Sequence, residues 1–246
     1  MRRLILSDIH GNLEALEAVM RDAQGLYDEV ACCGDIVGYG ASPREVIRWA
    51  RTALTSVIRG NHDRAVWEPG VLDSFTPSAR IAVAWCAQVL SAGDREWLRG
   101  LRAGPFWGDG FGLVHGSPDD EDAYLEYNMD VRGVDRLLRR SPCFLGHTHI
   151  QGGWKWHSGR MQQMPIPLPG EPERVVTLVA DVLYLINPGS VGQPRDHDPR
   201  AAYAIWDDTG RLLTYRRVEY DIESAQRRIV DAGLPQSLAT RLAVGR

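Results

Sequence analysis

The sequence predicts an α/β protein in which two sheets pack face to face and helices lie outside them. One observation is the β-α-β-α-β order of the first third, which gives a parallel sheet with right-handed crossovers. Another is a last third made of apolar runs joined by turn signals. The 246 residues, 44% hydrophobic and 24% charged, can bury a core without disulfide staples. We therefore expect a single domain over residues 1–246.

Residues 1–58 contain the three strands and two helices of that early order. The predicted strands are the short apolar runs 4–6, 30–33 and 55–58. Asn12 is the expected N-cap of a helix that continues toward Gly25, and Pro43 is the expected first residue of the second helix.

The middle of the chain is predicted to be more helical. Residue spacing predicts helices over 78–90, 94–101 and 131–140, followed by a strand over 143–145. Gly108-Asp109-Gly110 lies between two short apolar runs and indicates a hairpin, whose second strand leads to His115. Residues 117–128 are acidic and irregular, and we expect them to form a loop over the functional site.

The last third is predicted to be mostly strands, closed by two helices. Ser158-Gly159-Arg160 joins two short runs into a second hairpin, and a proline-rich loop over 165–172 follows it. The remaining predicted strands are 174–179, 182–186, 201–206 and 211–218, and the predicted helices are 222–232 and 235–244.

Composition argues against several functional classes. The formal net charge of −4 gives no general attraction to nucleic acid or to anionic membranes. None of the four cysteines belongs to a C-x-x-C pair, which argues against a thiolate zinc site. No apolar run approaches the length of a membrane span and no signal-peptide pattern is present, so we expect a cytoplasmic protein without a membrane partner. The sequence does not indicate an oligomeric state.

Histidine, aspartate and asparagine gather in short motifs at the ends of predicted strands, where an open α/β sheet places its ligands. Five of the seven histidines lie in these motifs, beside Gly, Asn or Asp and outside apolar faces. Histidine and carboxylate that converge at strand ends mark metal sites. The motifs are Asp8-Ile9-His10, Gly34-Asp35, Gly60-Asn61-His62-Asp63, a lone His115, and Gly146-His147-Thr148-His149.

The donor set indicates which metals fit. It combines imidazole nitrogen, carboxylate oxygen and one amide oxygen without sulfur, which suits Mn, Fe, Zn, Co or Ni and disfavours structural zinc or a pure magnesium site. The ligands are numerous enough for two ions that share one carboxylate. Two ions about 3.5–4 Å apart clamp the attacking and leaving oxygens of an in-line displacement and hold a nucleophilic hydroxide, which fits phosphate esters. The candidate ligands are Asp8, His10, Asp35, Asn61, His115, His147 and His149.

The set resembles the calcineurin-like dinuclear metallophosphoesterase superfamily, whose pattern is D-x-H, G-D, G-N-H-[DE], a single H and G-H-x-H. All five blocks are present in this order across residues 8–149. The resemblance implies a four-layer α/β/β/α sandwich of two mixed sheets. It also implies a metal-dependent phosphoric ester hydrolase that holds two divalent transition-metal ions.

The resemblance further implies a role for each motif residue. His62 would be the general acid that protonates the leaving oxygen or steadies the scissile phosphate, while a hydroxide bridging the metals attacks. Asp63 would orient the His62 ring by accepting its other N–H. The first ion would be held by Asp8, His10 and His149, the second by Asn61, His115 and His147, and Asp35 would bridge both.

Residues 7–12, 34–40 and 187–195 look like a narrower bacterial group of phosphodiesterases that includes YfcE and diadenosine tetraphosphatases. Three candidate substrate contacts lie in these stretches, each with a structural alternative. Arg195 could hold a phosphate or form a surface ion pair. Tyr39 could stack on a base or only belong to a glycine-shaped turn, and Asn12 could touch a phosphate or cap a helix.

We therefore predict a phosphodiesterase that acts on a small phosphate ester or anhydride, with nucleotide-like substrates as candidates. One alternative is a non-catalytic metal-binding scaffold on the same fold, which would have no chemical reason to keep His62 beside a complete ligand set. The other is a nuclease, which would need a basic groove. The charge of −4 and the lack of Lys/Arg runs disfavour a nucleic-acid partner. The native metal and the substrate stay open.

Overall fold

The computed structural model describes residues 1–246 and contains two six-stranded sheets. The first sheet has the order β3 (Ser56–Val57), β2 (Glu29–Cys32), β1 (Arg2–Leu6), β11 (Ala201–Asp207), β12 (Leu212–Val218) and β9 (Glu173–Thr177). The second sheet has the order β4 (Phe106–Trp107), β5 (Gly112–Leu113), β6 (Cys143–Phe144), β10 (Leu183–Asn187), β7 (Gly152–His157) and β8 (Arg160–Gln163).

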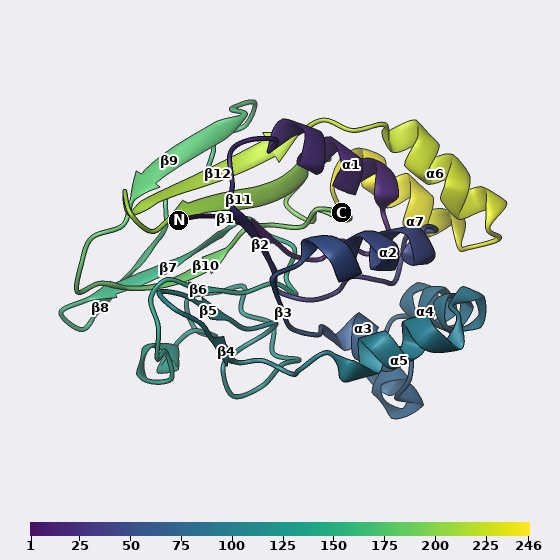
Figure 1. Cartoon of the computed structure of the whole chain (residues 1–246), viewed down its shortest axis with the longest axis horizontal. Coiled ribbons are helices and arrows are strands. Elements are labelled where there is room, and N and C mark those ends of the chain that lie inside the picture. The colour runs from purple at the N-terminus through teal and green to yellow at the C-terminus, as the bar shows by residue number, and fades with distance from the viewer.

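Both sheets are mixed. In the first sheet β1, β2 and β3 run parallel, and in the second β5, β6 and β10 do, while every other pair is antiparallel. The two sheets lie one above the other in Figure 1. The expected α/β fold of two mixed sheets is confirmed, and so are the early parallel order and both predicted hairpins.

Side-chain alternation along the strands builds the layers, because successive residues of a strand point to opposite faces. Leu4 and Leu6 of β1 pack with the helices, whereas Ile5 packs between the sheets. In β6 the residue Phe144 faces the first sheet, and Cys143 faces the outside of the second sheet. Full burial of one leucine-sized side chain contributes about 1.5–3 kcal/mol, so a register slip of one residue in either strand would be costly.

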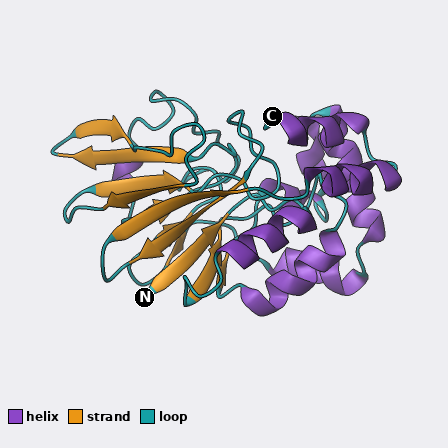
Figure 2. Cartoon of the chain, turned by 90° about the horizontal axis from the view of Figure 1, so that it is seen from above, coloured by secondary structure: helices purple, strands orange, loops and turns teal.

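The α-helices gather on one side of the molecule, beside the strands, as Figure 2 shows. The residue Asn12 caps α1 by accepting a hydrogen bond from the Ala15 N–H, and Pro43 opens α2, as expected. Most helices share one core with the outer face of the first sheet. Their bounds are α1 (Leu13–Asp22), α2 (Pro43–Ala53), α3 (Asn61–Ala65), α4 (Pro77–Val89), α5 (Ala92–Gly100), α6 (Ile222–Asp231) and α7 (Gln236–Thr240).

The outer face of the second sheet is covered mainly by the irregular segment 117–140, which contains only the short 3₁₀ helix η2 (Val134–Arg136). The helix expected over 131–140 is therefore wrong. Gly133 adopts a left-handed conformation (φ 83°) that interrupts helical geometry, and the Asp130 carboxylate accepts backbone N–H groups just before it. Val131 still packs against this sheet, so the apolar residues of the segment are buried without a helix.

In the last third, β9 and β10 follow each other in the sequence but belong to different sheets, because the chain crosses between the sheets at residues 178–182. The predicted helix 235–244 is split into α7 and the 3₁₀ helix η3 (Arg241–Val244), and another 3₁₀ helix, η1 (Pro69–Ser74), precedes α4. No helix has both the length and the apolarity that crossing a membrane requires.

Candidate metal centre

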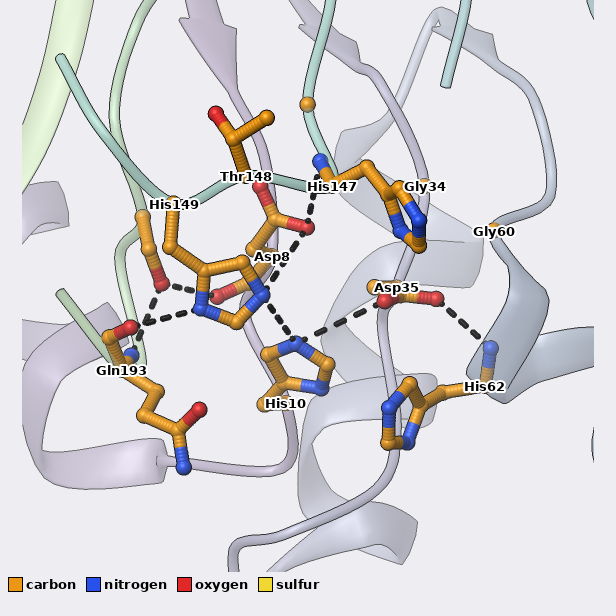
Figure 3. A network of polar contacts seen from close by, with 12 residues as sticks. Asp8, His10, Gly34, Asp35, Gly60, His62, His147, Thr148, His149 and Gln193 are labelled. Carbon is orange, nitrogen blue, oxygen red and sulfur yellow. Dashed lines mark hydrogen bonds and ion pairs between the residues drawn. The ribbon is translucent and has the colours of Figure 1, made fainter. Parts of the chain in front are cut away.

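The carboxyl ends of the parallel strands bring all the predicted ligands to one place between the sheets. Asp8 follows β1, Asp35 follows β2 and Asn61 begins α3 just after β3. From the second sheet, His115 follows β5, and the Gly146-His147-Thr148-His149 motif follows β6. Figure 3 shows Asp8, His10, Asp35, His147 and His149 converging from these loops. Such an edge is where open α/β sheets bind their ligands.

The ligand atoms form two groups that share one carboxylate. The first group contains Asp8, His10, Asp35 and His149, and the second contains Asp35, His115 and His147; all are buried, and the ligand atoms within each group lie within 4.8 Å of one another. The Asn61 Oδ1 lies 3.1 Å from Nε2 of His115, which adds an amide oxygen to the second group. The predicted ligand set is therefore assembled, with Asp35 common to both halves.

Backbone carbonyls fix the tautomer of three of these histidines. The Nδ1 atoms of His10, His115 and His149 lie 3.0, 2.8 and 2.6 Å from the carbonyl oxygens of Val37, Cys33 and Gln193. When Nδ1–H donates to a carbonyl, the Nε2 lone pair is left free for a metal. In all three rings that free nitrogen faces the cluster.

His147 presents its other nitrogen. Its Nε2 lies 3.1 Å from the Asp122 carbonyl, so Nε2–H donates there and Nδ1 is left for the cluster. The Tyr124 ring packs on the imidazole at a centroid distance of 3.9 Å. Asp122 and Tyr124 belong to the segment 117–128, which therefore lies over the site as expected.

Ion pairs connect this segment to two arginines in the stretch that follows β3. Glu121 accepts from Arg59, 2.8 Å away, and from Arg64 of α3, while Arg64 also pairs with Asp122 at 2.6 Å. Sequence reasoning missed these contacts. The available signal was an acidic loop together with an arginine directly after the Gly60-Asn61-His62-Asp63 motif, but nothing in the pattern pairs them.

Several atoms of the cluster show that it fits a cation. The Oδ2 atoms of Asp8 and Asp35 are buried without a hydrogen-bond partner. The Nε2 atoms of His10 and His149 face each other at 3.1 Å, and burial holds the pKa of both rings well below the usual range, so two lone pairs meet. Buried unpaired acceptors are costly, and a cation between them removes that cost.

The protonation of the metal-free cluster also indicates a cation site. Burial raises the pKa of Asp8 to about 6. Burial also opposes the charging of His115, yet the carboxylates of Asp35 and Asp8 together raise its pKa to about 10. In the metal-free protein His115 therefore carries a proton. A metal ion could take the place of this proton, because the Asn61 oxygen and the negative charge of Asp35 lie beside the His115 ring.

The loops that carry the ligands are conformationally strained. Left-handed backbone, which costs a non-glycine residue of order 1–3 kcal/mol, concentrates at this site. The motif glycines allow close approach: a Cβ at Gly60 would lie 2.1 Å from Asp35 Oδ1, and one at Gly146 would lie 2.1 Å from the Ser7 hydroxyl. Non-glycine residues with positive φ at the site are Asp8, His10, Asp35, Tyr39, His147 and His149.

The loop that follows β10 braces both halves of the site. The Asn187 side-chain amide donates to the Gly146 carbonyl at 3.1 Å and to the Thr148 hydroxyl at 2.9 Å. The Ser190 hydroxyl donates to the Asp8 carbonyl at 2.8 Å. The sequence marked this loop only by its resemblance to the narrower group and did not indicate this bracing role.

His62 is held by packing and by its backbone. Its N–H donates to Asp35 Oδ1 at 2.8 Å, which Figure 3 shows, and its ring packs against Tyr39 and Phe75 at centroid distances of 4.4 and 4.6 Å. The Nδ1 atom is buried without a partner. Of the two ring nitrogens, Nε2 is therefore the one that can meet a ligand.

The expectation that Asp63 orients the His62 ring is wrong. The Asp63 carboxylate accepts the backbone N–H groups of Ile36, Val37 and Gly60, at 2.9, 3.1 and 3.0 Å. Asp63 is the third residue of α3, and side chains at this position reach back to the N–H before the helix, as in a capping box. Asp63 therefore fixes the loop after Asp35 to the start of α3.

Replacing Asp63 with alanine is expected to destabilise the fold by about 1–3 kcal/mol for each buried donor left without an acceptor. Urea unfolding would measure the loss. Asp63→Asn is the matched control, because its Oδ1 can still accept two of the three hydrogen bonds, and it should lose less. An unchanged unfolding midpoint for Asp63→Ala would contradict this role.

A cavity of about 280 Å³ opens beside the cluster, and it is lined in part by Asn61, His62 and His147. Two of the three expected substrate contacts, Tyr39 and Arg195, line it. Asn12 does not: its Oδ1 caps α1 and its Nδ2 donates to the Gly192 carbonyl at 2.9 Å. The helix-cap alternative is confirmed for Asn12. Sequence reasoning missed the other seven lining residues, which are Ser74, Phe75, Thr76, Ala79, Asp122, Tyr124 and Arg241.

Comparisons with known proteins agree with this geometry. A model of the calcineurin-like phosphoesterase superfamily domain matches residues 1–210. An uncharacterised protein of Methanocaldococcus jannaschii is 35% identical over 256 residues, covering 98% of this chain and 97% of that protein. A metallophosphoesterase from Sphaerobacter thermophilus is 38% identical with a TM-score of 0.84, covering 100% and 99%. A proposed diadenosine tetraphosphatase is 15% identical with a TM-score of 0.51, covering 89% and 94%, which shows a shared fold.

Proposed function

Since the chain belongs to the calcineurin-like phosphoesterase superfamily, we propose that it is a dinuclear metal-dependent phosphodiesterase of nucleotide-like substrates. Membership supports the hydrolysis of phosphate esters, and the buried Asp/His cluster supports the use of metal. One observation carries the step to two ions. The Asp35 carboxylate belongs to both ligand groups and keeps a buried oxygen without a partner.

The two groups divide the ligands as the motifs imply. When bound, two divalent ions would neutralise phosphate oxygens and supply an acidified water as the nucleophile. Asp35 would serve both ions. Asp8, His10 and His149 would hold the first ion, and Asn61, His115 and His147 would hold the second.

His62 would act on the leaving oxygen of the phosphate ester. Burial lowers the pKa of His62 to about 4, so the free ring is neutral near pH 7. A phosphate anion in the cavity would favour the charged ring and raise that pKa. Nε2 could then donate to the phosphate and transfer its proton to the departing oxygen. The rigid packing of the ring supports this assignment.

The walls of the cavity favour a small nucleotide-like substrate. Tyr39, Phe75 and Tyr124 line the cavity beside the cluster, and the exposed Tyr124 ring can pack against a planar base. Tyr124 is 51% exposed, so part of its face is open to a ligand. A cavity of about 280 Å³ also suits a small molecule better than a nucleic-acid duplex.

Metal removal tests the proposal. Stripped protein is expected to lose hydrolysis of bis-p-nitrophenyl phosphate and to regain it when Mn, Ni, Co or Zn is added singly, with Mg as the comparison. Bound metal should also raise the melting temperature, since a ligand at a hundred times its Kd stabilises by about 2.7 kcal/mol. The readouts are p-nitrophenol release and calorimetry.

Each pattern of results has a distinct meaning. Thermal stabilisation with restored hydrolysis supports the phosphodiesterase. Stabilisation without hydrolysis of any phosphate ester would favour the metal-binding scaffold. Neither effect with any metal would contradict the metal centre itself.

A further inference from the structure

Two arginines, Arg195 and Arg241, line the cavity, and neither pairs with an Asp or Glu side chain. Arg195 donates to the Gln193 side-chain oxygen at 3.1 Å and to the Tyr39 hydroxyl at 3.2 Å. Arg241, in η3, donates to a main-chain oxygen of Arg246, the last residue. None of these acceptors is an Asp or Glu side chain, so neither arginine is held in an ion pair with a side-chain carboxylate.

The two charges converge on one aromatic ring. The guanidinium carbons of Arg195 and Arg241 lie 5.8 and 5.7 Å from the centroid of the Tyr39 ring. Burial lowers the pKa of Arg241, and the charge of Arg195 lowers it further. Two like charges held at a partly buried wall repel each other, and an anion bound between them would relieve that repulsion.

This pair is coupled to the metal centre through two residues. The Gln193 backbone carbonyl accepts from His149 Nδ1, while its side-chain oxygen accepts from Arg195. The Tyr39 ring lies 4.6 Å from His10 and 4.4 Å from His62, centroid to centroid. The Tyr39 ring therefore contacts both the guanidinium groups and the His10 and His62 rings, and both arginines line the same cavity as His62.

We infer that Arg195 and Arg241 bind a second phosphate group of the substrate, next to the reacting one. The substrate class is then a compound with two linked phosphates, such as a nucleoside diphosphate or a longer phosphoanhydride. This inference rests on the proposed function, because the reacting phosphate must lie at the metals. Arginine suits the role, since its planar fork pairs with phosphate oxygens in a bidentate manner.

The pairing also predicts selectivity. A substrate with one phosphate would leave both guanidinium groups without an anion, and sites built to bind a polar group discriminate strongly against ligands that lack it. Arg241 lies beyond residues 1–210, so the part of the chain that defines the superfamily does not contain it. The C-terminal segment would thereby set substrate choice for a centre built by the first 149 residues.

Competition by ADP and AMP against bis-p-nitrophenyl phosphate tests the inference. With metal-loaded protein and a constant free metal concentration, ADP is expected to bind about tenfold or more tightly than AMP, as expected for added charge-assisted hydrogen bonds. Arg241→Ala should bring the ratio of the two inhibition constants close to one. Arg241→Lys should retain part of it, because lysine keeps the charge but loses the fork.

The matched control is Arg227→Ala on α6, which removes an exposed charge that pairs with Glu223 and does not line the cavity. It should keep the ADP preference. Arg241→Gln is the substitute where the alanine variant does not fold, as judged by thermal unfolding. A wild-type ratio near one, or equal weakening of ADP and AMP in the Arg241 variants, would overturn the inference.

The two proposals fail in different ways. If no phosphate ester is hydrolysed with any metal, the proposed function fails, and calorimetric affinities of ADP and AMP for the metal-loaded protein still decide whether a second-phosphate site exists. If hydrolysis is restored by metal but ADP and AMP compete equally, the second-phosphate site fails alone.

Discussion

Replacing His62 with alanine is expected to lower turnover by about 10²–10⁴-fold while leaving the bound metal unchanged, because general acid–base groups contribute on this scale. Metal binding should survive, since the contact of residue 62 with Asp35 is made by its backbone N–H and not by the ring. The measurement is kcat for a nucleoside phosphodiester, whose leaving oxygen needs a proton, at saturating metal, with metal content from elemental analysis of the same sample.

The leaving group separates the two possible roles of the ring. p-Nitrophenolate departs without needing a proton, whereas a sugar alkoxide needs one. If His62 protonates the leaving oxygen, His62→Ala should lose more activity on a nucleoside phosphodiester than on the nitrophenyl ester. If the ring only steadies the phosphate, both substrates should lose the same factor.

A matched variant sharpens this comparison. His62→Gln keeps a side-chain N–H donor but cannot transfer a proton at neutral pH, so it should rescue a steadying role and not an acid role. The ring is packed between Tyr39 and Phe75, and a melting curve must show that each variant keeps its fold. An unchanged rate in both variants would remove His62 from the mechanism.

The ligand cluster could be predicted from the sequence because its chemistry is concentrated in short motifs. Each motif follows a strand, and parallel strands end at one edge, so local pattern and sheet topology together imply convergence. The layers of the fold could likewise be predicted from local pattern, as the strand residues Leu4, Ile5 and Leu6 show. Each residue is apolar because each faces a core, two toward the helices and one toward the second sheet.

What could not be predicted depends on contacts between distant segments or on single backbone angles. Asp63 was expected to meet the neighbouring His62 ring, but its position in α3 directs the carboxylate to backbone donors. The apolar spacing of 131–140 is helical, yet one left-handed residue, Gly133, removes the helix. Arg241 reaches the cavity only because η3 packs beside α6 and α7, and no sequence motif marks that arrangement.

Asparagine in place of Asp35 is expected to abolish hydrolysis and to remove at least one of the two bound metal ions. Asparagine has nearly the same shape, and its Oδ1 can still accept a hydrogen bond from the His62 N–H, so the loop should keep its conformation. What disappears is the negative charge. Burial alone would raise the pKa of Asp35, but the charge of His115 opposes it most strongly, and the pKa of Asp35 lies well below its usual range, so this carboxylate is ionised in the free protein.

The charge matters because Asp35 is common to both ligand groups. Two divalent ions close together repel each other, and a shared carboxylate is the group that lies between them. Metal content is therefore expected to fall from two ions per chain to one or none, with hydrolysis below detection. Elemental analysis after gel filtration, combined with p-nitrophenol release, measures both quantities in one preparation.

Asp63→Asn is the matched control for this loss. Asp63 is as deeply buried as Asp35 and lies next to the same loop, but its carboxylate binds backbone N–H groups and not the cluster. This variant should keep its metal even where it is less stable. If Asp35→Asn kept two ions per chain while Asp63→Asn lost them, the assignment of Asp35 as the shared ligand would have to be abandoned. If both variants lost metal equally, general loss of packing would explain the result, and a shared carboxylate would no longer be needed.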